Sequence, residues 1–123
     1  MKQRRYFPAC GVAGNYIVVI GGSTLEQIAK NTTEIYNMET GEWSYGPEVP
    51  SEIYLYDART AAFGDTFLLT GGRDEEHTDL KTIYEFDPVS KDFILRKEKI
   101  YKGRYSHVAL TASPEMYPCS EKK

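Results

Sequence analysis

The side chains that could bind a metal or carry a proton are few and lie far apart. His77 belongs to the polar run at 74–79, Asp-Glu-Glu-His-Thr-Asp, whose carboxylates are hard oxygen ligands of the kind that cations prefer. The run lacks the Asp-x-Asp-x-Asp-Gly spacing of a calcium loop, which favours a solvated loop over a cation site. His107 lies elsewhere in the chain, and we expect it to pack or to hydrogen-bond. We therefore predict no metal and no cofactor.

Nucleophilic catalysis finds equally little support. The two cysteines, Cys10 and Cys119, have no neighbour that would activate a thiol, and neither Gly-x-Ser-x-Gly nor the phosphate-binding Gly-x-x-x-x-Gly-Lys-Ser/Thr occurs. We predict that the protein is not an enzyme. Two isolated cysteines also make no disulfide framework, which favours a reducing compartment and a cytoplasmic location.

Tyrosine and arginine side chains in linking segments are the best candidates for a functional surface. Both residue types bury large areas at protein interfaces, and arginine can grip a carboxylate with two hydrogen bonds. The alternative is that they pack between structural elements or lie on a solvated loop. The candidate partner-binding residues are Tyr54, Tyr56, Arg59, Arg73, Tyr101, Arg104 and Tyr105.

The composition is that of a globular protein. Of 123 residues, 41% are hydrophobic and 27% charged, and the net charge of −3 argues against binding to nucleic acid. The basic start, 1–5, resembles a signal peptide, but Pro8, Gly11 and Gly14 interrupt the apolar stretch that follows, which favours a strand. No apolar run is long enough to cross a bilayer, so we expect a soluble protein that binds no membrane.

The chain repeats itself with a period of 50 residues. Gly-Asn-Tyr-Ile-Val-Val-Ile-Gly-Gly at 14–22 corresponds to Gly-Asp-Thr-Phe-Leu-Leu-Thr-Gly-Gly at 64–72, an offset of 64 − 14 = 50. The same offset relates Tyr36 to Phe86 downstream, and Trp43 to Phe93. Such a period is typical of repeat architectures.

Each part of the repeat predicts a local structure. Gly-Asn and Gly-Asp are hairpin turns, because these residues tolerate positive φ, and the apolar runs 16–20 and 67–69 are strands buried on both faces. The Gly-Gly doublets allow a turn or a close approach of backbones. We expect four short strands per repeat, with 23–28 forming either a loop or a short helix.

The apolar run ending in Gly-Gly, followed by a tyrosine and then a tryptophan seven residues later, resembles the kelch repeat. The stretch 35–43, Ile-Tyr-Asn-Met-Glu-Thr-Gly-Glu-Trp, carries this resemblance most closely, while the second copy has phenylalanine at both aromatic positions. The resemblance implies an all-β fold of four-stranded antiparallel kelch blades, an incomplete β-propeller.

A third repeat begins and stops. Arg104 and the following Tyr-Ser-His resemble the opening of a kelch repeat, and we equate this stretch with the one that begins at Arg59. We expect blade 1 at 1–50, blade 2 at 51–99, the first strand of a third blade at 100–112 and a loose tail at 113–123. Because a propeller needs four to eight blades, we expect a piece of a longer protein, with self-association through exposed blade faces as the alternative.

The resemblance implies a protein–protein interaction module of adaptor or cytoskeletal type, because loops at one end of kelch propellers commonly bind partners. The partner would be a protein whose identity the sequence leaves open. Two other interpretations stay open: part of a kelch-like propeller enzyme, such as a lyase, epimerase or oxidase, and a truncated product without activity of its own.

Overall fold

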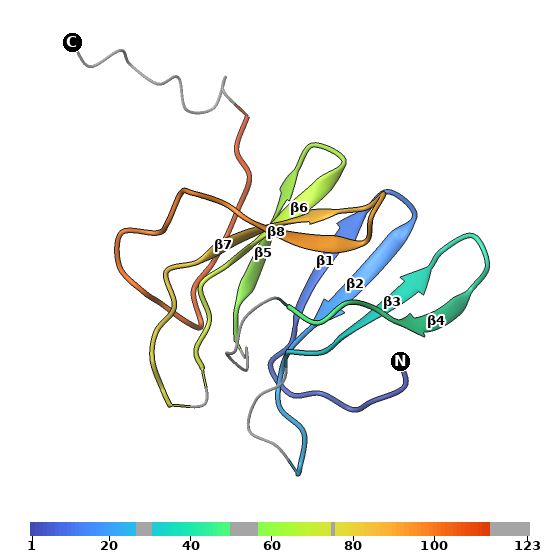
Figure 1. The fold of residues 1–123 in the computed structure, drawn as a ribbon, viewed down its shortest axis with the longest axis horizontal. Helices are drawn as coiled ribbons and strands as arrows, with labels where there is room; N and C mark the ends of the chain where they lie inside the picture. Colours follow the sequence, from blue (N-terminus) through green and yellow to red (C-terminus); the bar gives the residue numbers. More distant parts are fainter. Residues whose placement is uncertain (27–30, 50–56, 75, 114–123) are drawn as a thin grey trace.

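Eight strands form two separate four-stranded antiparallel sheets in the computed structural model, which describes residues 1–26, 31–49, 57–74 and 76–113 (Figure 1). The strands of each sheet are neighbours in chain order, and no helix occurs in the described ranges. This confirms the predicted fold class. Their bounds are β1 Ala9–Ala13, β2 Tyr16–Ile20, β3 Thr33–Asn37, β4 Glu42–Tyr45, β5 Arg59–Phe63, β6 Thr66–Thr70, β7 Ile83–Asp87 and β8 Asp92–Leu95.

The predicted hairpin turns lie where the Gly-Asn and Gly-Asp pairs place them. Gly14 has a φ of 54° and Gly64 a φ of 59°, values that glycine adopts without steric cost. The turns bring Ala13 opposite Tyr16 and Phe63 opposite Thr66. Two-residue turns therefore fix the register of both hairpins, as expected for this turn chemistry.

The two sheets pack face to face through β1, β5 and β6. An ideal Cβ built on Gly11 of β1 would come within 2.4 Å of the Phe67 ring on β6, so only glycine lets the ring lie against this strand. Phe67 is 1% exposed, and its ring stacks 5.3 Å from that of Phe86. The hydrophobic core is thus mainly an interface between repeats.

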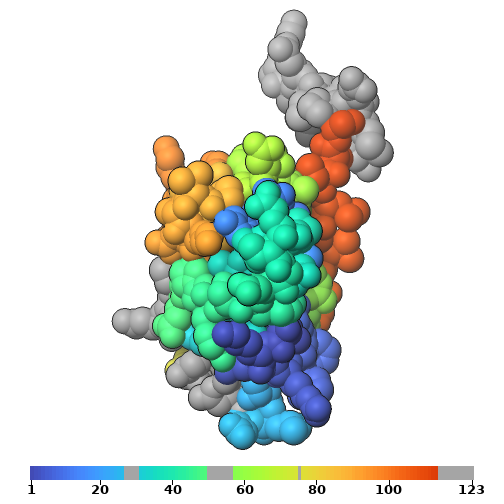
Figure 2. Space-filling model, turned by 90° about the vertical axis from the view of Figure 1, so that its right-hand side faces the viewer, coloured from blue at the N-terminus to red at the C-terminus, as the bar shows by residue number. Residues whose placement is uncertain are grey.

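In each sheet, two aromatic side chains from neighbouring strands lie on the same face of the sheet and contact each other. The rings of Tyr36 and Trp43 lie 5.1 Å apart in the first sheet, and those of Phe86 and Phe93 lie 5.3 Å apart in the second. The phenylalanines are buried in the hydrophobic core, whereas the tyrosine and tryptophan are half-buried. Figure 2 views the molecule from the side of β3 and β4, with the N-terminal residues directly below them.

Residues 23–26 contain no helix; Ser23 instead makes an isolated bridge with Tyr6, and residues 27–30 lie outside the described ranges. All four glycines of the two doublets have positive φ, and a Cβ on Gly22 or Gly71 would come within 2.7 or 2.5 Å of the carbonyl oxygen of Tyr6 or Arg104, so the doublets permit a close approach of backbones. No helix of the described residues has the length and apolar character needed to cross a membrane.

The start of the third repeat aligns differently from our expectation. Phe7, Asp57 and Ser106 share the same unusual backbone, with φ values of 53°, 55° and 48°. The amide of Asp57 donates to the Phe7 carbonyl at 3.0 Å, and that of Ser106 donates to the Asp57 carbonyl at 3.2 Å. The third repeat is therefore offset by 106 − 57 = 49 residues. The equation of Arg104 with Arg59 was wrong, because Arg59 corresponds to Val108 and Arg104 to position 55.

Candidate partner-binding surface

The longer loops of both sheets gather at one end of the strands, and the hairpin tips lie at the other (Figure 1). This loop end holds the segments that follow β2, β4, β6 and β8. The arrangement follows from the meander, because antiparallel strands joined in chain order place alternate connections at the same end. The predicted partner-binding residues that the structure describes belong to this end of the second sheet.

Arg73 and Tyr105 meet across two of these loops. The guanidinium carbon of Arg73 lies 3.5 Å from the centre of the Tyr105 ring, a stacked cation–π contact. Arg73 also forms an ion pair with Asp79, with Nε and one terminal nitrogen each 2.8 Å from the same carboxylate oxygen. The loop after β6 and the segment after β8 thus form a single surface.

Backbone hydrogen bonds hold Arg104 against the loop after β6. The amide of Gly72 donates to the Arg104 carbonyl at 2.8 Å, and the amide of Arg104 donates to the Leu80 carbonyl at 3.2 Å. Its side chain is exposed, and among the described residues it donates only to the nearby Lys102 carbonyl, at 3.3 Å. Tyr101, three residues earlier, is 88% exposed.

The segment 96–104 carries a surplus of positive charge that our sequence analysis overlooked. It holds Arg96, Lys97, Lys99, Lys102 and Arg104 against a single acid, Glu98. Arg96 pairs with Glu85 and Glu98, but among the described residues the other four cations form no ion pair. These five cations within nine residues can be read from the sequence, but our sequence analysis considered only the negative net charge of the whole chain.

A second polar cluster lies where β5 begins. Arg59 forms an ion pair with Asp57 at 2.6 Å, and the hydroxyl of Ser106 donates to the other carboxylate oxygen of Asp57. Asp57 is buried, whereas the Arg59 side chain is 37% exposed, so Arg59 pairs with a buried carboxylate and still reaches the surface. No local pattern in the sequence joins Asp57 to Ser106, which lie 49 residues apart.

His107 makes a hydrogen bond, as we expected. Its Nε2 lies 2.9 Å from the Thr70 hydroxyl, while Nδ1 is buried and has no hydrogen-bond partner in the part of the chain that the structure describes. Burial, and next the positive charges of Arg59 and Arg104, lower the pKa of the imidazole, against an opposing effect of Asp57.

Two tyrosines and the acidic loop complete the residues that the sequence analysis named. Tyr54 and Tyr56 lie outside the described residues. In the acidic loop, Asp74 accepts the amide hydrogens of Glu76 and Thr78, an arrangement typical of an Asx turn. Within the described part of the chain, no group of three potential metal ligands is present.

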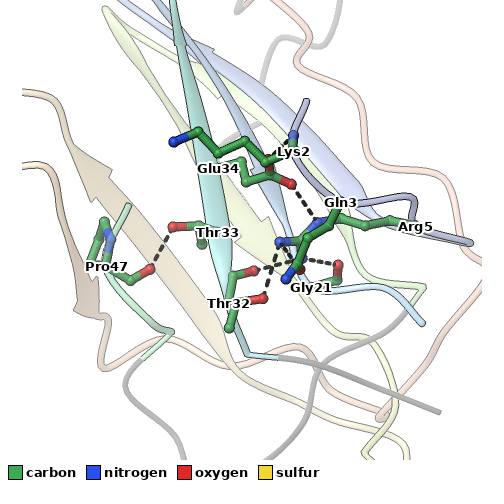
Figure 3. Close-up of polar contacts among 8 residues, drawn as sticks. All are labelled: Lys2, Gln3, Arg5, Gly21, Thr32, Thr33, Glu34 and Pro47. Carbon is green, nitrogen blue, oxygen red and sulfur yellow. Dashed lines mark hydrogen bonds and ion pairs between the residues drawn. The ribbon is translucent and has the colours of Figure 1, made fainter. Parts of the chain in front are cut away.

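A buried ion pair holds the N-terminal residues on the first sheet (Figure 3). Nε of Arg5 lies 3.1 Å from Glu34 Oε2, and both side chains are fully buried. The guanidinium also donates to the carbonyls of Gly21 and Thr32, at 2.7 and 3.0 Å. The backbone amide of Lys2 donates to the second oxygen of Glu34. Our sequence analysis missed this network, because it treated 1–5 only as a basic start.

Comparison with known families identifies one relationship. Residues 4–50 match the family model of the kelch motif, and this range includes the complete first sheet. The resemblance drawn from the stretch 35–43 is thereby confirmed. No curated protein matches the chain.

Proposed function

The chain carries a kelch repeat at 4–50, and from that premise we propose that it is a protein-interaction module which recruits a partner through the loop end of its second sheet. The observation that carries the proposal is the exposed Tyr101 among Lys99, Lys102 and Arg104, cations that no described carboxylate neutralises. Tyrosine supplies apolar contact area, and the cations attract an opposite charge.

The charge of this segment defines the partner by its chemistry. A protein segment that places carboxylates around an apolar side chain would pair with the cations and cover Tyr101 at the same time. Arg104 suits a bidentate carboxylate contact, because within the described ranges its guanidinium donates to no acceptor except the neighbouring Lys102 carbonyl. We propose an adaptor role in the cytoplasm, in which the module binds without chemical change of its partner.

The fixed geometry of the loop end supports the proposal. Arg73 holds Tyr105 by stacking and Asp79 by an ion pair, and backbone hydrogen bonds fix both sides of Arg104. A surface that is ordered before binding loses less conformational entropy when the partner arrives. Arg73 and Tyr105 therefore act as supports, and Tyr101 and Arg104 as the groups that contact the partner.

Quantitative capture from cell extract tests this function. We compare the wild type with the double variant Tyr101→Ala/Arg104→Ala, and use Val89→Ala as the matched control because Val89 is 92% exposed in the turn between β7 and β8. Partners should be retained by the wild type and the control, lost from the double variant, and released by raised ionic strength, which screens surface charges. Recovery of the same partners by the double variant would refute the proposal.

A further inference from the structure

A hollow of about 310 Å³ lies where β1 and β5 begin, at the loop end of the molecule. Residues 7–10 line one wall and residues 57–60 line the other, so each wall comes from one of the two repeats. The amide of Asp57 joins the walls by donating to the Phe7 carbonyl at 3.0 Å. The hydroxyl of Thr60 crosses the same boundary and donates to the Cys10 carbonyl. The hollow is therefore bounded by contacts between two complete sheets.

One lining residue is a buried carboxylate that keeps an unsatisfied oxygen. The Asp57 side chain is only 7% exposed. Its Oδ2 accepts the hydroxyl of Ser106, whereas Oδ1 is buried and has no hydrogen-bond partner among the described residues. Nη1 of Arg59 lies 2.6 Å from Oδ1 but donates its hydrogen bond to the Ala58 carbonyl, at 2.9 Å. The ion pair thus balances the charge of Asp57 without satisfying this acceptor.

Arg59 brings hydrogen-bond donors to the same hollow. Within the described ranges its guanidinium makes one hydrogen bond, to the Ala58 carbonyl, which leaves the N–H groups of Nε and Nη2 without an acceptor. The guanidinium carries its donors in a rigid planar fork. The hollow therefore combines donors from a cation with an acceptor from an anion, and the charges of the pair cancel.

We propose that this hollow binds a carboxamide, the head group of asparagine and glutamine side chains and of small primary amides. The amide oxygen accepts from Arg59 and the amide nitrogen donates to Oδ1 of Asp57, because a carboxamide carries an acceptor and donors in one plane. A carboxylate would bring a second negative charge to Asp57, and an ammonium group a second positive charge to Arg59. Phe7, which is 66% exposed, offers apolar surface to the carbon atoms next to the amide.

Entry of the ligand needs one side-chain movement. Nη1 of Arg59 lies over Oδ1, so the guanidinium must turn before the amide nitrogen can reach the carboxylate. The Arg59 side chain reaches the surface, and exposed side chains change rotamer within nanoseconds. The site involves neither Tyr101 nor Arg104, so it does not rest on the proposed function.

Three probes of the same shape test the chemistry of the site. Isobutyramide, isobutyrate and 3-methylbutan-2-one are titrated into the unmodified, nitrogen-15-labelled protein and followed by NMR. Isobutyramide should shift the amide signals of Cys10, Ala58 and Arg59 saturably, at about millimolar concentration for so small a probe. The ketone lacks the N–H donor and the carboxylate is repelled by Asp57, so each should bind roughly tenfold more weakly.

Asp57→Asn should change the specificity of the site, which a purely structural role of Asp57 would not do. Asparagine keeps the shape of the side chain and tolerates the φ of 55° at this position, but it removes the negative charge. The variant should bind isobutyrate more tightly than isobutyramide, because Arg59 then faces no anion. Asp65→Asn makes the same change in the exposed turn between β5 and β6 and should keep the order of the wild type.

N-acetylglutamine methylamide distinguishes the two sources of a carboxamide. Tighter binding than that of isobutyramide would assign the site to a side chain of a partner protein, and weaker binding would assign it to a free primary amide. Absence of saturable shifts with isobutyramide, equal affinities for the amide and the ketone, or shifts away from 7–10 and 57–60 would overturn the proposal. An unchanged order of affinities in folded Asp57→Asn would do the same. If that variant does not fold, the titrations of the unmodified protein decide.

Discussion

At the scale of single residues, the surroundings of His107 lower the pKa of its imidazole. Nε2 is committed to the Thr70 hydroxyl, and Arg59 and Arg104 add positive charge nearby. Burial and these two charges lower the pKa of the folded-state imidazole, while Asp57 partly opposes them. The folded protein therefore binds a proton at this site less readily than the unfolded chain does.

The pH dependence of stability follows from the direction of this shift. The contribution of His107 is fully present above the unfolded-state pKa of about 6.5 and is lost as the pH falls below it towards the folded-state pKa. Between pH 7.5 and 5, a range that spans the reference histidine pKa of ~6.5, we expect the free energy of unfolding to fall further for the wild type than for His107→Asn. Urea denaturation at each pH measures it. His77→Asn is the control for the other histidine. An unchanged pH profile in His107→Asn would contradict this.

At the scale of elements, a buried ion pair joins the N-terminal segment to β3 and to the loop before it. Arg5 contacts Glu34 on the strand and the carbonyls of Gly21 and Thr32 at the ends of the loop after β2. Removing one partner of a buried pair leaves an uncompensated charge, which costs about 3–5 kcal/mol. The segment 1–5 is therefore part of the first blade and not an appendage.

Substitution of neighbouring arginines tests this role. Arg5→Met should lower the free energy of unfolding by about 3–5 kcal/mol, because it leaves Glu34 buried without a cation. Arg4→Met changes an exposed neighbour of the same type and should alter stability by less than about 0.5 kcal/mol. Urea denaturation monitored by circular dichroism measures both. Equal effects of the two changes would show that Arg5 is no more structural than Arg4.

Local patterns in the sequence predicted the elements better than the contacts between them. Gly14 and Gly64 marked the hairpins, because positive φ is a local requirement, and the 50-residue period related Trp43 to Phe93. The Arg5–Glu34 pair joins positions 29 residues apart, and no local pattern specifies such a contact. We aligned the third repeat in the wrong register because we matched Arg104 with Arg59. The correct register is the one that aligns Ser106 with Asp57, which share a positive φ.

At the scale of the whole molecule, the interface between the sheets decides whether they fold as one unit. Phe67 belongs to the second sheet but lies against Gly11 of the first, and Phe86 stacks on it. Stacked repeats gain much of their stability from such neighbour interfaces. Neither sheet alone has this core, so we expect the two to unfold together.

The single tryptophan makes this coupling measurable. Trp43 lies on β4 of the first sheet, so its fluorescence reports a sheet that does not contain Phe67. Phe67→Ala should cost about 3–5 kcal/mol, as truncation of a buried phenylalanine does, and should shift the unfolding midpoint seen by Trp43 fluorescence as far as that seen by circular dichroism. Phe63→Ala, on the same sheet but 43% exposed, is the matched control and should shift both midpoints much less. The opposite result would be an unchanged unfolding midpoint from Trp43 fluorescence in Phe67→Ala, together with two transitions in the circular dichroism curve. The sheets would then unfold independently, and the contact between β1 and β6 would not be part of a shared core.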